Sequence, residues 1–218
     1  MDKKTARLRF LAQQSNVPVR FGLKLLDELK DPLPSLGKLL RDWAQHREEY
    51  TELTGRGVFL SGPPGCGHSE QAVSTLLSNM LWNGATGLYI SCPEFVEMEK
   101  RSFSGDGPGE YADLPFHRGE ATTRELLVLD NIGSEHRTVT QFAVDLIKHL
   151  LLVRANKGLP TIAVTTMQDG PSWESTYGAD ITALVEENFD PVFYKPVMFR
   201  GWSGEDDGEF GATRHAAW

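Results

Sequence analysis

The amino-acid sequence predicts an α/β protein with a mostly parallel sheet. Short apolar segments with strand character alternate with segments whose apolar residues recur at helical spacing. A glycine-rich loop lies between the first such strand and the helix that follows it, and a later apolar strand ends in an aspartate. These three observations are typical of a parallel sheet that carries a ligand site at the carboxyl ends of its strands.

The size and charge of the chain limit the possible functions. Its 218 residues suit one sizeable α/β domain, and a net charge of −8 excludes a surface that is basic all over. The first 24 residues are nevertheless basic, through Lys3, Lys4, Arg7, Arg9, Arg20 and Lys24, and the end is acidic, through Glu205, Asp206, Asp207 and Glu209. A nucleic-acid contact would therefore be local and salt-sensitive. The alternative is that both ends are simply solvated.

Three features of the sequence favour a cytoplasmic protein. Cys66 and Cys92 lie in separate motifs, and neither has histidines at metal-ligand spacing, so both are interpreted as reduced thiols. The N-terminus lacks the apolar region of a secretory signal. No apolar run approaches the length needed to span a bilayer, so no membrane contact is expected.

The elements are expected in the following order. A short helix over about residues 5–14 is followed by an extended segment before Pro18, and Ser35 is expected to cap an amphipathic helix that runs to about Tyr50. Strands are expected at Gly57–Ser61, Leu88–Ser91, Leu126–Asp130, Pro160–Thr165 and within Val192–Phe199. The helices between them are expected over about Ser69–Asn83, Pro93–Phe103 and Thr140–Asn156, and residues 104–120 are predicted to form a long loop. The domain prediction is a basic arm with an amphipathic helix over 1–50, a core over 51–200, and an acidic, disordered tail over 201–218.

The most specific motif is the glycine-rich loop, which consists of Gly62, Pro63, Pro64, Gly65, Cys66, Gly67, His68 and Ser69. Glycines allow successive backbone amides to curl around phosphate oxygens, and the following helix adds its positive N-terminal end. Ser69 occupies the position whose hydroxyl holds Mg²⁺ in phosphate loops. His68 stands where that pattern has lysine, and a histidine is mostly neutral at pH 7. The alternative interpretation is a glycine turn that binds no ligand.

Two further strand ends carry candidate site residues. Asp130 closes the strand Leu126–Asp130, as in a Walker-B segment, and its carboxylate is expected to anchor Mg²⁺ through water. Asn131 follows it, and an amide can orient a water molecule but cannot accept its proton. Thr165, at the tip of the fourth strand, is a candidate sensor of the γ-phosphate. The alternative for Thr165 is a hydroxyl that only caps the strand end.

These parts, in this order, resemble the helicase-loader and transposition-helper branch of the AAA+ ATPases, the DnaC-like and IstB-like proteins. The resemblance covers roughly residues 15–200. It depends on four segments of this sequence: 17–21 (VPVRF), 57–65 (GVFLSGPPG), 126–133 (LLVLDNIG) and 160–166 (PTIAVTT).

The resemblance implies an AAA+-type P-loop NTPase fold, a three-layer sandwich with a five-stranded, mostly parallel sheet and no separate lid domain. One strand would separate the phosphate-loop strand from the Walker-B strand. The family binds ATP or ADP with Mg²⁺, assembles into homo- or hetero-oligomers, and acts on DNA or on a replicative helicase or transposition protein. By the same resemblance, Lys100, Arg101 and Phe103 are candidates for a DNA contact, and Arg154 and Arg200 for an inter-subunit arginine. A solvated helix end is the alternative for Lys100 and Arg101.

The sequence also departs from the family at three catalytic positions. His68 replaces the loop lysine, Asn131 replaces an acid, and the segment Ala183–Phe189 offers acids where an arginine finger is expected. We therefore expect an AAA+-like loader or helper with weak or no ATP turnover. A non-enzymatic adaptor that binds its partner without nucleotide is the alternative. A small-molecule kinase is disfavoured, because such enzymes depend on the loop lysine and a basic lid.

Overall fold

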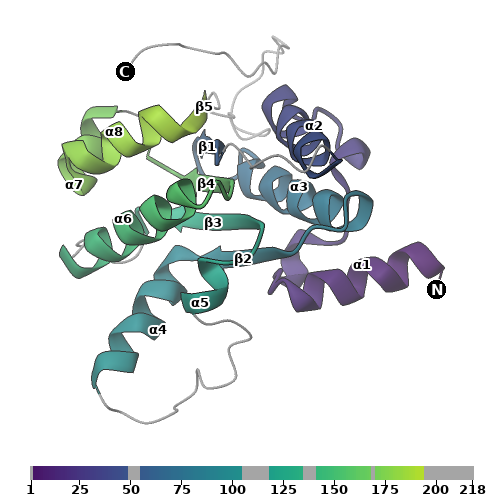
Figure 1. Ribbon diagram of the computed structural model, residues 1–218, viewed down its shortest axis with the longest axis horizontal. Coiled ribbons are helices and arrows are strands. Elements are labelled where there is room, and N and C mark those ends of the chain that lie inside the picture. Colours follow the sequence, from purple (N-terminus) through teal and green to yellow (C-terminus); the bar gives the residue numbers. More distant parts are fainter. Residues whose placement is uncertain (1, 49–54, 105–117, 135–140, 168–169, 194–218) are drawn as a thin grey trace, which may run out of the picture.

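The computed structural model describes residues 2–48, 55–104, 118–134, 141–167 and 170–193. Within these residues, five parallel strands form a single sheet in the order β2-β3-β4-β1-β5 (Figure 1). The strands are β1 (Gly57–Ser61), β2 (Gly87–Ser91), β3 (Leu126–Ile132), β4 (Thr161–Thr165) and β5 (Phe189–Phe193). The predicted α/β class is confirmed, and β4 separates the strand before the glycine loop from the strand that ends near Asp130.

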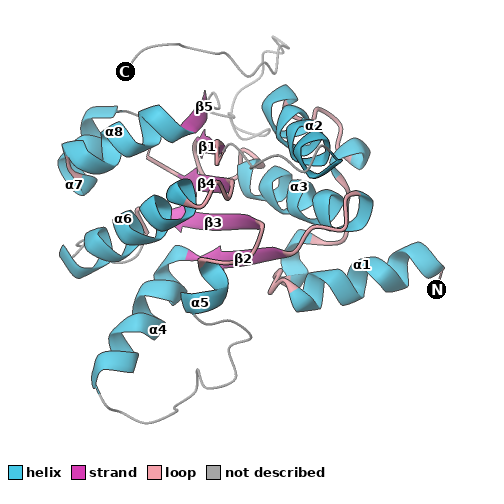
Figure 2. Ribbon diagram, viewed as in Figure 1, coloured by secondary structure: helices cyan, strands magenta, loops and turns pink. Residues whose placement is uncertain are grey.

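Helices cover both faces of the sheet, so the domain has three layers (Figure 2). One face is covered by α1 (Lys3–Gln14), α2 (Pro34–Glu48) and α3 (His68–Trp82), and the short 3₁₀ helices η1 (Val19–Phe21) and η2 (Leu26–Glu28) connect α1 to α2. The other face is covered by α4 (Cys92–Ser104), the short α5 (Arg118–Ala121), α6 (Gln141–Asn156), α7 (Gly170–Tyr177) and α8 (Ala179–Asn188). None of the described helices is long and apolar enough to cross a membrane.

Burial on both faces explains the composition of the strands. All five residues of β1 and of β4 are buried, so these segments are nearly continuous apolar runs with no polar alternation. Successive side chains still point to opposite faces: Val58 and Leu60 join the core beneath α3, whereas Phe59 joins the core beneath α7 and packs edge-on against Trp173 at 4.9 Å.

The register of the strands brings the candidate residues to one edge. Ser61 pairs with Thr165, so the ends of β1 and β4 lie side by side, and the Gly62 amide donates to the Thr165 carbonyl at 3.2 Å. In the pairing of β2 with β3, Asp130 lies opposite Ser91. Because all strands run in parallel, the glycine loop and Asp130 meet at the carboxyl edge of the sheet.

The C-terminal part of the fold differs from the prediction. The fifth strand is Phe189–Phe193, whereas we expected it within Val192–Phe199, and residues 194–199 lie outside the described residues. Asp190 and Pro191 interrupt the apolar pattern that would have indicated this strand. An edge strand tolerates proline because one of its sides forms no hydrogen bonds to a neighbouring strand. Helices α7 and α8, between β4 and β5, were not predicted.

Smaller differences concern loops and helix starts. Helix α2 begins at Pro34 and not behind a Ser35 cap, because proline fits the first turn of a helix, where its missing N–H is not needed. The predicted loop over residues 104–120 ends in the short helix α5, and its residues 105–117 lie outside the described part of the chain. The tail predicted over 201–218 also lies outside it.

Candidate functional site

The glycine loop joins β1 to α3 and contains two glycines in a left-handed backbone conformation. It leaves β1 at Ser61 and enters α3 at His68, which is the strand–loop–helix context that the sequence predicts. Gly65 and Gly67 have φ values of 83° and 89°, a region that side chains with a Cβ rarely adopt. Open space surrounds both positions, so they are glycine for conformation and not for close packing. The loop places backbone amides at the positive end of the fifteen-residue helix α3, where an anion is stabilised.

The structure brings together the two predicted magnesium ligands, Ser69 and Asp130. The Ser69 hydroxyl donates to Oδ1 of Asp130 at 2.8 Å, although the residues are 61 positions apart. Asp130 is only 1% exposed, and the backbone N–H of Asn131 donates to the same oxygen at 2.9 Å. A carboxylate and a hydroxyl are ligands that suit Mg²⁺, which keeps several waters and takes further oxygens from a nucleotide. Among the described residues there is no group of three or more His, Cys, Asp or Glu side chains that could hold a metal ion.

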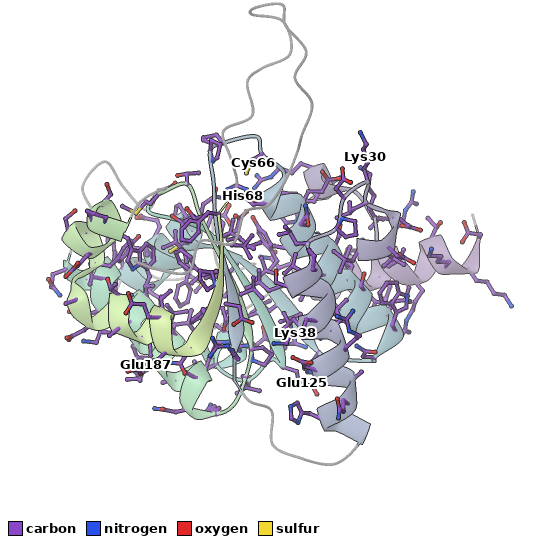
Figure 3. All side chains as sticks on the ribbon, turned by 90° about the horizontal axis from the view of Figure 1, so that it is seen from above. Lys30, Lys38, Cys66, His68, Glu125 and Glu187 are labelled. Carbon is purple, nitrogen blue, oxygen red and sulfur yellow. The ribbon has the colours of Figure 1, made fainter. Side chains whose placement is uncertain are left out.

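His68 is buried beside this pair. Its side chain is 6% exposed, and its Nδ1 accepts the Ser69 amide at 3.0 Å. Burial lowers the pKa of His68, and the charge of Asp130 and the carbonyl groups of Thr165 and Gly62 oppose that shift only in part. The ring is therefore neutral at pH 7 and supplies no ammonium-like charge to the loop. Figure 3 shows Cys66 and His68 together at this edge, with Lys38, Glu125 and Glu187 toward the opposite edge.

Asn131 adopts a left-handed backbone conformation with φ of 61°. The pairing of β3 with β4 is irregular between Leu129 and Ile132, so Asn131 sits in a bulge at the strand end. Asparagine is one of the few residues with a Cβ that adopts this conformation at modest cost. The role of Asn131 in orienting water stays a prediction.

Thr165 is engaged in the fold. It is 1% exposed, and its hydroxyl donates to the Ile132 carbonyl at 2.7 Å and accepts the Met167 amide at 3.1 Å. The hydroxyl proton is therefore already used within the fold. These contacts fit the alternative interpretation, a hydroxyl that caps the strand end, and the role of Thr165 as a γ-phosphate sensor stays a prediction.

Arg154 does not fit the inter-subunit role that the resemblance implied. Its side chain is completely buried, and burial lowers its pKa to about 9, so the guanidinium stays protonated at pH 7. It donates to the hydroxyl of Thr161 and to the backbone carbonyls of Ala121, Arg124 and Pro160. Arg154 thus joins α6 to the segments that lead into β3 and β4, and we correct its assignment to a structural residue.

The structure says less about the residues predicted to contact DNA or a neighbouring subunit. Lys100, Arg101 and Phe103 lie in the last turns of α4, and Lys100 is half-buried; the side chains of the other two are outside the described part of the chain. Arg200 lies outside it as well. The segment searched for an arginine finger, Ala183–Phe189, forms the end of α8 and the first residue of β5. A nucleic-acid contact and an inter-subunit arginine therefore stay predictions.

Sequence reasoning missed a tyrosine in the site. Tyr89 of β2 is 1% exposed, and its hydroxyl donates to Oδ2 of Asp130 at 2.8 Å. Burial and the charge of Asp130 raise the pKa of Tyr89, so the phenol remains a neutral donor. The only signal in the sequence was the Tyr89 hydroxyl within the otherwise apolar strand Leu88–Ser91. That signal does not indicate that Asp130 is its hydrogen-bond partner.

Comparison with known proteins supports the fold. The structure of the DnaC helicase loader superposes with a TM-score of 0.62 and 18% identity, covering 80% of this chain and 98% of the other. DnaI superposes at 0.57 with 19% identity and covers 80% and 92%. The replication initiator DnaA bound to AMPPCP and single-stranded DNA superposes at 0.54 with 12% identity over 77% of this chain and 49% of DnaA. No family model and no curated protein matches the sequence.

The strand order, the position of the glycine loop between β1 and α3, and these superpositions all indicate the same fold. At such low identity the superpositions show the fold alone, and the predicted fold, a five-stranded parallel sheet between two layers of helices, is confirmed. The chain is an α/β protein with the fold of the AAA+ P-loop domains of DnaC and DnaA.

Proposed function

We propose that this chain is an AAA+-like nucleotide-binding protein that acts as a helicase loader or a replication or transposition helper, with impaired or absent ATP hydrolysis. The observation that carries the proposal is the 2.8 Å contact between Ser69 and the buried Asp130, directly beside the glycine loop. The contact prepares an oxygen pair for Mg²⁺ at the place where the loop presents its amides to phosphate.

Each part of the site has a defined task in this proposal. The loop amides and the N-terminus of α3 bind the phosphates, and Ser69 and Asp130 hold Mg²⁺, which would neutralise charge on the nucleotide. His68 is buried beside Ser69 and adds no positive charge to the site. Losing one charge-assisted contact, worth roughly 1.5–3 kcal/mol, weakens nucleotide binding by about one to two powers of ten. Binding is therefore retained but weak.

The same residues explain why turnover should be low. Hydrolysis requires a group that accepts a proton from the attacking water, and the Asn131 side chain has no such capacity. An arginine supplied to the transition state contributes about 10³–10⁵ in rate in related phosphoryl transfers. Arg154 is buried within its own chain and cannot supply it in this conformation.

The biological role is inferred from the structural neighbours. One neighbour is a helicase loader, and another is an initiator that binds AMPPCP and single-stranded DNA. We extend these roles to this chain as a proposal: the partner would be a replicative helicase or a transposition or replication protein, DNA would contact the end of α4 near Lys100, and the active form would be an oligomer. The burial and neutrality of His68 favour the second candidate, an adaptor that binds its partner without nucleotide.

Calorimetry separates the two candidates. ATP and ADP are titrated into the purified chain with and without Mg²⁺, and phosphate release is measured in parallel. We expect weak, Mg²⁺-dependent binding and almost no release. The double variant His68→Lys with Asn131→Glu is expected to bind more tightly and to release phosphate measurably, whereas Arg9→Ala, which removes an exposed arginine from α1 outside the loop, should behave like the wild type. Rapid turnover by the wild type would refute the hydrolysis argument, and no binding by any variant would favour the adaptor.

A further inference from the structure

The edge of the sheet at β2 is occupied by the segment that connects α1 to η1. The Tyr89 amide donates to the Ser15 carbonyl at 2.7 Å, and the Asn16 side chain donates to the Tyr89 carbonyl at 3.3 Å. Asn16 itself adopts a left-handed conformation with φ of 57°, which turns the chain onto this edge. The backbone of Tyr89 is therefore fixed by the N-terminal segment on one side and by β3 on the other.

The side chain of Tyr89 is held from the same segment. Arg20 donates to the Tyr89 hydroxyl through a long contact of 3.4 Å, and its guanidinium lies 4.7 Å from the centre of the Phe21 ring. The Phe21 ring in turn packs on the Tyr89 ring, with 5.6 Å between centroids. Arg20 and Phe21 thus hold the phenol from the outer side while its hydroxyl donates inward to Asp130.

This arrangement forms a continuous chain of contacts from the surface to the glycine loop. It runs from exposed Arg20 through the Tyr89 hydroxyl to Oδ2 of Asp130, and from Oδ1 of Asp130 to the Ser69 hydroxyl. A carboxylate can accept several hydrogen bonds, so the Tyr89 contact fixes the orientation of Asp130 and leaves other lone pairs for a water molecule of hydrated Mg²⁺.

We propose that Tyr89 is a positioning residue for the Asp130 carboxylate, and that Arg20 holds Tyr89 in place, so that residues 15–21 help to set the affinity for Mg²⁺-nucleotide. The proposal rests on the proposed nucleotide site and adds to it a control point outside the glycine loop. Val19, next to Arg20, is 96% exposed, so a partner that contacts this segment could affect the Asp130 carboxylate through Arg20 and Tyr89.

Two substitutions test the proposal through Mg²⁺-dependent binding. Tyr89→Phe removes the hydroxyl and keeps the ring, and we expect the Kd for Mg²⁺-ATP to rise about tenfold while the Kd for ATP without Mg²⁺ changes less than twofold. Arg20→Ala should raise the Mg²⁺-ATP Kd about twofold to threefold in the wild type and should have no further effect in the Tyr89→Phe background. Arg20→Lys, which keeps a donor, should recover part of the loss.

Matched controls separate positioning from general destabilisation. Tyr177→Phe removes a buried tyrosine hydroxyl from α7 in the opposite core layer, and Arg9→Ala removes an exposed arginine from α1. Both should leave the Mg²⁺ dependence unchanged. Equal loss of affinity with and without Mg²⁺ in Tyr89→Phe, tighter Mg²⁺-dependent binding, or additive effects of Arg20→Ala and Tyr89→Phe would each overturn the proposal.

A nucleotide-free measurement keeps this inference distinct from the proposed function. Urea unfolding of Tyr89→Phe, Asp130→Asn and the double variant forms a cycle that reports whether the two residues are coupled. If the wild type binds no nucleotide, the proposed function fails together with the claim about Mg²⁺-nucleotide affinity, and this cycle still decides whether Tyr89 positions Asp130. Additive effects on the unfolding midpoint would then show that Tyr89 does not hold Asp130.

Discussion

Replacing Arg154 with alanine should destabilise the fold strongly. Its guanidinium makes four hydrogen bonds of 2.7–2.8 Å, to one hydroxyl and three backbone carbonyls. Each such bond to a charged donor contributes roughly 1.5 kcal/mol or more, about 6 kcal/mol in all. Removing a buried cation also removes its desolvation penalty, which returns part of that sum. We therefore expect Arg154→Ala to lower the free energy of unfolding by about 3–5 kcal/mol.

Urea unfolding at pH 7, followed by circular dichroism, measures this loss. The matched control is Arg124→Ala, because Arg124 forms a partly exposed ion pair with Glu120 at 3.0 Å one helical turn away. Such a pair is worth about 0.5 kcal/mol. The structural assignment would be refuted if Arg154→Ala unfolded at the wild-type urea concentration. If that stable variant also failed to assemble, Arg154 would return to the inter-subunit role that the resemblance implied.

Four further predictions follow from the site and the sheet. Gly57→Ala should destabilise the fold by about 2 kcal/mol in urea unfolding, since its Cβ would lie 2.2 Å from the Thr161 carbonyl oxygen. His68→Lys alone should tighten Mg²⁺-ATP binding about 10- to 100-fold in calorimetry; an unchanged Kd would mean that the loop does not bind phosphate. Asn131 has a φ of 61°, so Asn131→Gly should preserve the free energy of unfolding in urea and Asn131→Glu should lower it by about 1 kcal/mol. Asp130→Asn should raise the melting temperature of the ligand-free chain and weaken Mg²⁺-dependent binding.

The central strands were predictable because both faces of the sheet are covered. Burial on two sides requires apolar runs, and β1, β3 and β4 carry them with glycine or proline at their borders. β5 was placed too late in the chain because an edge strand is under weaker constraint and accommodates Asp190 and Pro191. Helix α7 was not predicted because its described residues place Trp173 and Tyr177 in the core, too few for a clear period, whereas α8 carries Ile181, Leu184 and Val185 at helical spacing and was missed although that signal was present.

The site was predictable where a local motif determines it. The glycine loop and the end of β3 are recognised from neighbouring residues, and the parallel register then brings Ser69 to Asp130. The contact of Tyr89 with Asp130, and those of Arg154 with the carbonyls of Ala121 and Arg124, join residues that are 30 or more positions apart, and a single chain gives no pattern for such pairs. The assignment of Arg154 followed position in the resemblance, which does not report that the side chain points into the core.

The buried carboxylate of Asp130 is the physical reason to prefer a nucleotide-binding protein over an adaptor. Asp130 is 1% exposed and accepts hydrogen bonds from neutral donors, the hydroxyls of Ser69 and Tyr89 and the Asn131 amide. Taking a carboxylate out of water costs several kcal/mol, which neutral donors offset only in part. An apolar side chain would continue the run Leu126–Leu129 at lower cost. A fold that served only as an interaction surface would be more stable with an apolar residue at position 130. A bound Mg²⁺ would instead stabilise the buried carboxylate. If Asp130→Asn left both the melting temperature and the nucleotide affinity unchanged, this preference would be lost and the adaptor would be the better description.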